Sequence, residues 1–480
     1  MDPTYLPATR LADLARTRQV GCLELLDHYI GRVERLDGPI NAVVVRDFER
    51  ARERARRLDS TDDRAAPLFG VPMTVKESFD VAGLPTTRGH AAARDHRAAV
   101  SSLSVQRLEA AGAVILGKTN VPVDLADWQS YNPVYGATSN PWNFAHTPGG
   151  SSGGSAAALA AGFSALEIGS DIGGSIRVPA HYCGVFGHKP TWTLCPNYGD
   201  PATSAAAATD IAVIGPLARS AADLREALDV LAGPDPAETG LALSLPAPRA
   251  SSLRDLRVAV WASEPGHETD LETIAAIEHL ASFLEREGAT VSRTARPAFD
   301  ATEAFHLYLR LLDAAWSARN SEEFLIEKRR FAAALPADYI SADAIMARSV
   351  DMSHRVWLGL NEQRHRFRRS WSAFFREWDV LLSPAIATAA LPHMREGQTW
   401  ERRARVGERE IPYNDMLFWP GLTGGYHLPA TVAPMGFTRD GLPLGVQISG
   451  PIYGDRTTIA VAGMLEAAWL AFSPPPGVSG

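Results

Sequence analysis

Hydrophobic residues follow two different spacings along this chain, one typical of helices and one typical of buried strands. In residues 1–60, apolar positions such as Leu26 and Ile30 recur every three or four residues, which predicts two or three amphipathic helices. Short apolar runs flanked by Gly or Pro predict buried strands at residues 70–75, 113–116 and 212–214. Because alternating helices and strands are typical of α/β proteins, we expect an α/β fold.

The second half of the chain follows a linker rich in Pro, Ala and Ser at residues 233–252. A strand pattern restarts at residues 256–262. Between residues 301 and 378, apolar and aromatic side chains recur at near-helical intervals, which predicts a helical segment packed against the core. Further strand-like blocks are residues 380–384, 429–434 and 443–448. We expect a single domain over residues 1–480, with N-terminal helices in residues 1–60, the chemically informative motifs in residues 61–232, and a second half in residues 253–480 that contains the helical segment 301–378.

Composition and charge narrow the class of protein. The chain has 480 residues, of which 46% are hydrophobic and 21% charged, so it can bury a large core and has no compositional sign of disorder. With a net charge of -8 it has no basic surface for nucleic acid, and the arginines of residues 46–57 alternate with acids as on a solvated helix face. No basic region leads into an apolar run at the N-terminus, and no apolar stretch reaches membrane-spanning length. We expect a cytoplasmic enzyme that contacts neither nucleic acid nor membrane.

Cysteine and histidine do not indicate a metal site. The three cysteines, Cys22, Cys183 and Cys195, have no metal-ligand spacing and are expected to be reduced, buried thiols. A nitrilase-like nucleophile at Cys183 is an alternative that its apolar setting disfavours. No histidine near the motifs has the spacing of a metal-binding or Ser-His-Asp arrangement, and we expect neither a metal nor a cofactor. These histidines are His90, His96, His146, His181 and His188.

Two short motifs match well-known patterns in a context that does not suit them. Residues 112–119 fit the P-loop expression GxxxxGK[ST], but the four variable residues are Ala, Val, Ile and Leu, which predict a strand and not a phosphate-binding loop. Residues 150–154 fit G-x-S-x-G with Ser152 at the centre. The nucleophile elbow needs a preceding apolar strand, and residues 140–148 are instead rich in turn formers and contain two prolines.

The strongest chemical signal is the concentration of Gly and Ser in residues 147–155 and 171–177. Glycine lets backbone amides approach a reacting oxygen closely, and serine supplies a nucleophile or a proton relay. We therefore take Ser175 as the candidate nucleophile.

Together with residues 70–76, these two segments closely resemble the amidase signature family of serine hydrolases. The resemblance implies a central, mostly mixed β-sheet surrounded by helices, and a cis peptide bond before Ser151. It also implies a catalytic triad of Lys76, Ser151 and Ser175. The implied oxyanion hole consists of the backbone amides of Ile172, Gly173, Gly174 and Ser175, and the implied supporting residues are Gly149, Gly150, Ser152, Asp171 and Arg177.

Lys76 can act as a base only if it loses its charge. Lysine has an ordinary pKa near 10.4, and burial lowers that value by disfavouring the charged form. Lys76 ends an apolar run, so its amine is expected to emerge in a dry pocket. Neutral Lys76 would then take a proton from Ser151, which would take one from Ser175 as that serine attacks a carbonyl.

The substrate is less defined than the reaction. Aromatic and aliphatic residues dominate residues 305–331 and the neighbouring loops, which favours a small, uncharged, apolar or aryl amide, with esters and carbamates as further possibilities. Residues 197–207 are a further expected contributor. The expected substrate-binding residues are Asp124, Leu125, Trp128, Gln129 and Tyr198.

An alternative within the family is the A subunit of a glutamine-dependent tRNA amidotransferase, which shares the Gly-Gly-Ser-Ser-Gly-Gly-Ser run. Residues 192–201 depart from the pattern of that protein, so a stand-alone amidase, as a monomer or homodimer, is the preferred interpretation. A non-enzymatic binding protein on the same fold would be favoured if a triad position were missing, and all three are present.

Overall fold

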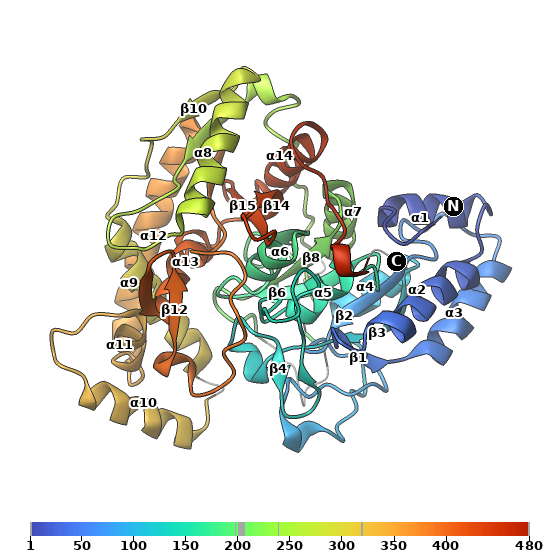
Figure 1. The fold of residues 1–480 in the computed structure, drawn as a ribbon, viewed down its shortest axis with the longest axis horizontal. Helices are drawn as coiled ribbons and strands as arrows, with labels where there is room; N and C mark the ends of the chain where they lie inside the picture. Colours follow the sequence, from blue (N-terminus) through green and yellow to red (C-terminus); the bar gives the residue numbers. More distant parts are fainter. Residues whose placement is uncertain (1, 197, 200–206, 239, 318–319, 479–480) are drawn as a thin grey trace.

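Two β-sheets form the centre of the molecule (Figure 1). The computed structural model describes residues 2–196, 198–199, 207–238, 240–317 and 320–478. Within these residues, the strands of the two sheets are β1 (Val43–Arg46), β2 (Pro72–Lys76), β3 (Val114–Thr119), β6 (Glu167–Asp171), β7 (Phe186–Lys189), β8 (Val213–Ala218), β9 (Arg257–Val260), β10 (Thr290–Ser292), β11 (Val380–Pro384), β14 (Ala430–Phe437) and β15 (Pro443–Ser449). Two small hairpins pair β4 (Tyr131–Asn132) with β5 (Gly136–Ala137) and β12 (Arg403–Val406) with β13 (Arg409–Pro412).

The larger sheet is mixed, as expected. Its strand order is β10-β9-β11-β15-β14-β7-β8-β6, parallel from β10 to β11 and antiparallel from there to β6. The smaller sheet, β1-β3-β2, meets its β6 edge where Met73 bridges Leu166. The ends of β2 and β6 therefore lie near each other, and they carry Lys76 and Asp171.

Helices cover both faces of the larger sheet (Figure 1). Alternation along β14 shows why, since the Thr431 hydroxyl bonds Thr458 while the next residue, Val432, packs in a cluster with Ala156 and Ile176. Successive side chains of this strand thus face different helical layers. The helices are α1 (Ala8–Arg16), α2 (Cys22–Leu36), α3 (Phe48–Ser60), α4 (Leu103–Ala110), α5 (Gly153–Ala160), α6 (Arg177–Cys183), α7 (Ala221–Leu231), α8 (Leu271–Arg286), α9 (Ala301–Ser317), α10 (Glu322–Ala334), α11 (Ala342–Ala347), α12 (His354–Glu377), α13 (Phe418–Gly424) and α14 (Asp455–Ala468).

Helix α5 is buried along its whole length, because its sequence contains only small residues and one leucine. It packs between α6 and strands of both sheets. At Gly154 a Cβ atom would lie 2.3 Å from the backbone nitrogen of Asn120, so only glycine permits this approach. The Gly- and Ala-rich run after the serine cluster is therefore a close-packed helix that holds the preceding loop against the sheets.

Most elements expected from the hydrophobic pattern are confirmed. The N-terminal helices are α1 to α3, the predicted strands are present, and the described part of residues 301–378 contains α9 to α12. Residues 114–119 of the P-loop match form strand β3, so this segment is a strand and not a phosphate-binding loop. Strands β1, β6, β7 and β10 were not predicted, and each has only three to five residues.

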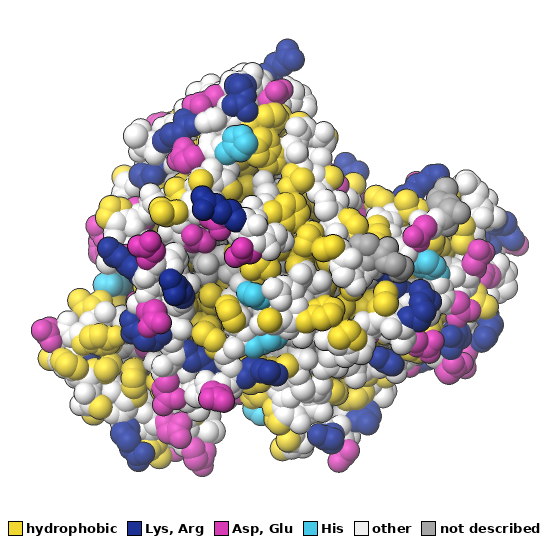
Figure 2. All heavy atoms as spheres, viewed as in Figure 1, with side chains coloured by type: hydrophobic (Ala, Val, Ile, Leu, Met, Phe, Trp, Pro, Cys, Tyr) yellow, Lys and Arg dark blue, Asp and Glu magenta, His cyan; other side chains and the backbone are white. Residues whose placement is uncertain are grey.

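On the face of the molecule that Figure 2 shows, acidic and basic side chains are interspersed, and neither kind forms a large patch. Cys22, Cys183 and Cys195 are free and buried, as predicted. Within the part of the chain that the structure describes, no helix combines the length and the apolar character that crossing a membrane requires.

Trp371 tests the packing of the helical segment. Its ring is fully buried and stacks on Phe375 at 5.6 Å, while its indole N–H has no acceptor among the described residues. Trp371→Ala should lower the free energy of unfolding by about 3–5 kcal/mol, because it leaves a cavity. Trp371→Phe keeps an aromatic ring and removes the unpaired donor, so it should cost much less in urea denaturation. Equal losses in the two variants would contradict this account.

Candidate active site

The Lys76 amine lies at the end of β2 with no exposure to solvent. Its Nζ lies within hydrogen-bond distance of three hydroxyls, 2.7 Å from Ser151 Oγ and 2.9 Å from Ser152 Oγ and Ser170 Oγ. Burial lowers the pKa of Lys76 well below the ordinary lysine value, although the negative charge of Asp171 acts in the opposite direction. The environment therefore favours a neutral amine surrounded by hydroxyl groups.

Two glycines shape the loop that brings Ser151 to the amine. Gly149 has φ +87°, a left-handed conformation that favours glycine. At Gly150 a Cβ atom would lie 2.3 Å from the carbonyl oxygen of Asp127, so a larger residue would push the two segments apart. The Gly150–Ser151 peptide bond is cis, in agreement with the family resemblance.

A buried ion pair shapes the turn that carries Ser175. Arg177 donates to both carboxylate oxygens of Asp171, at 2.8 and 3.0 Å, and neither side chain is exposed. Asp171 also accepts from the backbone amide of Ile176 at 3.1 Å. Burial opposes ionisation of Asp171, but the Arg177 guanidinium outweighs it and lowers the pKa of this carboxyl to about 2. The Asp171–Arg177 ion pair thus holds the turn between β6 and α6 in place, and we call this pair the clamp.

The backbone amides at this turn differ in whether they already donate a hydrogen bond within the protein. Gly174 donates its N–H to Asp171 Oδ1 at 2.9 Å, which corrects the expectation that its amide is free to hold an oxyanion. The physical reason is that the Asp171 carboxylate needs several donors when buried. Among the described residues, no acceptor bonds the amides of Ile172, Gly173 or Ser175. Trp128 supports the turn by donating its indole N–H to Gly173 O at 3.0 Å.

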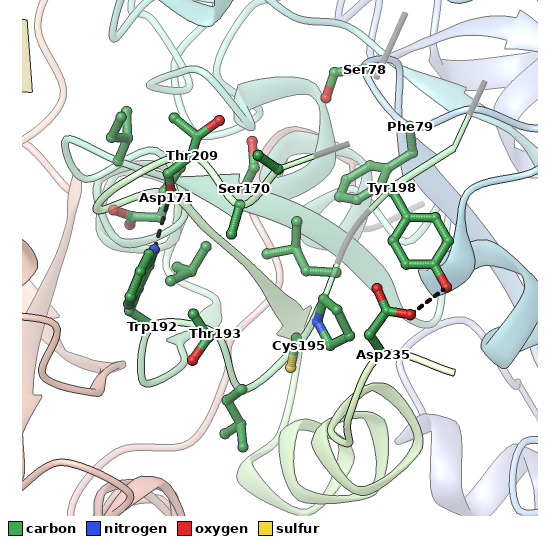
Figure 3. A pocket seen from close by; sticks show the side chains of 18 of the residues that line it. Ser78, Phe79, Ser170, Asp171, Trp192, Thr193, Cys195, Tyr198, Thr209 and Asp235 are labelled. Atoms are coloured by element: carbon green, nitrogen blue, oxygen red, sulfur yellow. Dashed lines mark hydrogen bonds between the residues drawn. The ribbon is translucent and has the colours of Figure 1, made fainter. Parts of the chain in front are cut away.

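Ser151 and Ser175 line one cavity of about 500 Å³. No direct hydrogen bond joins their hydroxyls, while the Ser152 amide bonds Ser175 O at 3.1 Å. Figure 3 shows the wall of this cavity, where Trp192 donates to Thr209 O and Tyr198 to Asp235. These bonds brace the loops on two sides of the cavity.

Ser175 also lines a second, smaller cavity of about 130 Å³. Its other walls include α10, α11 and the short helix η5 (Tyr413–Leu417). Ser151 does not line it. Ser175 therefore stands where two differently built cavities meet.

The residues expected to bind substrate divide between these cavities, with one exception. Asp124 and Leu125 line both cavities, Trp128 lines the smaller one and Tyr198 the larger one. Gln129 is the exception, because its buried side-chain amide bonds both the N–H and the carbonyl of Met394 at 2.6 Å and lines neither cavity. The expected loop at residues 197–207 falls mostly outside the described residues.

Several residues of the site were missed in the sequence. Ser170 contacts the Lys76 amine directly, and Glu167 lies behind it, bonded to Thr119 at 2.9 Å. Burial raises the pKa of Glu167 to about 7. For Glu167 the signal was weak but present, because it lies four residues before Asp171 in one strand and shares a face with it. Ser170 directly precedes Asp171 and lies on the other face of the strand, so the alternation gave no signal for it. Within the described part of the chain, no group of three metal-ligating side chains occurs.

The chain is similar to known proteins over almost its whole length. The sequence model of the Amidase family matches residues 24–459. The chain is 32% identical over 488 residues to a glutamyl-tRNA(Gln) amidotransferase subunit of Synechococcus sp. (strain CC9605), covering 95% of each chain. It is 33% identical over 490 residues to an acylamidase of Rhodococcus erythropolis, covering 96% of this chain and 95% of the relative. Its fold matches that of a bacterial aryl acylamidase of the amidase signature family with a TM-score of 0.81, at 25% identity, covering 97% of this chain and 96% of the other. The resemblance seen in the motifs and the expected α/β fold are confirmed.

The clamp at the turn predicts a large stability effect. Asp171→Asn should lower the free energy of unfolding by about 3–5 kcal/mol, because it leaves the Arg177 charge buried without its carboxylate. The double variant Asp171→Asn/Arg177→Met should lose less than Asp171→Asn alone, since no unpaired charge remains. The matched control is Asp351→Asn, which breaks the exposed pair with Arg329 and should change stability little. A small effect of Asp171→Asn in urea denaturation would contradict the clamp.

Proposed function

The chain belongs to the amidase family and is a hydrolase of amide carbon–nitrogen bonds, and we propose that it acts alone, through a serine acyl-enzyme. The observation that carries this proposal is the buried Lys76 amine, 2.7 Å from Ser151 Oγ, at the edge of a cavity that Ser175 also lines. A neutral amine in this position is a base for a hydroxyl relay.

In the proposed acylation step, Lys76 Nζ accepts the proton of Ser151 while Ser151 Oγ accepts that of Ser175. Ser175 Oγ attacks the carbonyl carbon and forms a tetrahedral intermediate. The oxyanion is held by the amides of Ile172, Gly173 and Ser175. Hydrogen bonds between catalytic groups are often longer before substrate binds, which is consistent with the absence of a direct Ser151–Ser175 bond.

Collapse of this intermediate breaks the carbon–nitrogen bond. The proton then passes from Ser151 to the leaving nitrogen, and Lys76 returns a proton to Ser151. Water attacks the acyl-enzyme by the same relay and releases the acid. Asp171 and Arg177 support the turn and take no part in proton transfer.

The substrate class we propose is a small amide with an apolar or aryl group. Trp192, Phe79 and Leu194 line the larger cavity, and such walls suit an aryl or alkyl group. The similar acylamidase and aryl acylamidase support this class. Esters and carbamates share the acyl chemistry and are proposed as further substrates.

A role within a tRNA amidotransferase is the alternative, since one similar protein carries that name. The departure of residues 192–201 from the pattern of that protein favours the stand-alone enzyme. Glutaminase activity that depends on co-purifying subunits would reverse this preference.

The nucleophile is tested by Ser175→Ala. This variant should keep the melting temperature within a few degrees, lose labelling by a fluorophosphonate, and lose at least about 1,000-fold in kcat/KM for an aryl amide, because no acyl-enzyme can form. Ser152→Ala is the matched control: it removes a neighbouring hydroxyl but leaves the nucleophile, so labelling should persist. Labelling of Ser175→Ala would refute the assignment.

The base is tested by the pH dependence of kcat/KM. Protonated Lys76 is inactive, so kcat/KM should rise with pH through the lowered pKa of Lys76 and level off well below pH 10.4, the ordinary lysine value. Lys76→Arg, which stays protonated, should be inactive over the whole range. Because Glu167 raises the pKa of Lys76, Glu167→Gln should move the midpoint to lower pH. A midpoint that moves upward would contradict this electrostatic link.

A further inference from the structure

The smaller cavity contains a buried carboxylate with an unsatisfied oxygen. Asp343, in α11, is 5% exposed and lines this cavity. Its Oδ1 accepts from Asn414 Nδ2 at 2.6 Å, whereas its buried Oδ2 has no hydrogen-bond partner among the described residues. A buried carboxylate oxygen without a donor is costly unless a ligand supplies one.

Other charged side chains also line this cavity, among them Arg88. Asp127 pairs with Arg402 at 2.6 Å, and Asp124 bonds His90 at 2.6 Å. Lys328 pairs with Asp313. Among the described carboxylates that line this cavity, Asp343 alone forms no ion pair with a basic side chain, so it leaves an unmatched site for a donor or cation.

The aromatic lining suits the same kind of ligand. Phe324 and Phe331 pack on Trp400, with ring centroids 5.5 and 6.2 Å apart. Lys328 Nζ lies 5.7 Å from the centroid of Phe324, so an aromatic face of this wall already accepts an ammonium group. Aromatic faces beside a carboxylate stabilise cations by cation–π and ionic interactions.

The position of Ser151 indicates which half of the substrate enters this cavity. In the proposed reaction Ser151 gives its proton to the leaving nitrogen, so the leaving group must lie on the side that Ser151 lines. Ser151 lines the larger cavity and not the smaller one, whereas Ser175 lines both. In the proposed reaction the acyl chain therefore extends from Ser175 into the smaller cavity, whose walls include residues of α10 and α11.

We propose that the smaller cavity binds the acyl half of the substrate and that Asp343 selects short acyl chains ending in an ammonium group. The substrate class is then amides of short amino acids, with the apolar or aryl group on the leaving amine in the larger cavity. The cavity of about 130 Å³ is well below the size of drug-sized sites, which limits the length of the chain. This inference rests on the proposed function. It changes the expected substrate in one respect, because the acyl group is now expected to carry a positive charge.

The ionisation of Asp343 is compatible with this role. Burial raises its pKa to about 6, Asn414 and Lys328 act in the opposite direction, and the nearby Asp415 adds to the rise. The carboxyl is therefore mostly ionised at neutral pH, and a bound ammonium would favour the ionised form further.

The test is a set of matched p-nitroanilides. The γ-aminobutyryl, δ-aminovaleryl and ε-aminocaproyl compounds are each compared with the anilide in which a methyl group replaces the ammonium. For the wild-type protein, kcat/KM at pH 7.5 should be about tenfold or more higher for the charged member at one or more chain lengths. Preference for the methyl member at every length would overturn the proposal without any variant.

The Asp343→Asn variant then tests whether Asp343 causes the preference for charged anilides. This substitution keeps the shape of the side chain and its acceptor for Asn414. It should reduce kcat/KM for the preferred charged anilide by about tenfold or more, and change the methyl partner less than about twofold. Asp351→Asn, which removes an exposed carboxylate of the same region, should leave both values unchanged. An unchanged ratio in a folded Asp343→Asn protein would overturn the role of Asp343.

The experiment distinguishes a failure of the Asp343 proposal from a failure of the proposed function. If wild-type protein cleaves no anilide of either kind and is not labelled by a fluorophosphonate, the acyl-enzyme proposal fails. If the methyl anilides are cleaved and no charged preference exists, only the selection by Asp343 fails.

Discussion

The buried ion pair between Asp171 and Arg177 is the interaction on which the rest of the site depends. Its carboxylate gathers the amides of Gly174 and Ile176, while the guanidinium reaches Pro420 O at 2.8 Å and Gln447 Oε1 at 2.7 Å. The turn with Ser175 is thereby tied to α13 and to β15, elements far away in the sequence. A buried pair adds little net stability because desolvation is costly, so its main effect is geometric. It also uses the Gly174 amide, so the proposed oxyanion hole consists of the three remaining amides at the turn.

Burial gives the Lys76 amine its chemical character. At the surface the same side chain would be a cation, whereas here desolvation favours its neutral form and three hydroxyls replace water around it. Nearby carboxylates limit this effect, because Asp171 and Glu167 both favour the charged form. The strength of the proposed base is therefore a balance between burial and two negative charges, and strand β6 supplies both of them.

The reaction and the choice of substrate are assigned to different parts of the fold. Lys76, Ser151 and Ser175 lie at the junction of the two sheets and the small-residue helix α5. The walls proposed to distinguish substrates come from loops on one side and from α9 to α11 on the other. In the proposed reaction a substrate is held on both sides of its scissile bond, because Ser175 lines both cavities. Substitutions in α10 or α11 can thus change the acyl group without disturbing the proposed relay.

The sequence by itself determined many of the local elements and indicated the groups that we propose to react. Hydrophobic spacing predicted most strands of the two sheets and the helical character of residues 301–378. Glycine and serine content identified the two loops. Both signals reside in neighbouring residues. Only the tertiary structure decided which groups meet. It brings Ser170 to the Lys76 amine, binds Gln129 to Met394, uses the Gly174 amide for Asp171, and places Asp343 beside aromatic residues of another helix. The physical reason is that a hydrogen bond or an unpaired carboxylate depends on partners brought close by folding, and local sequence pattern does not specify them.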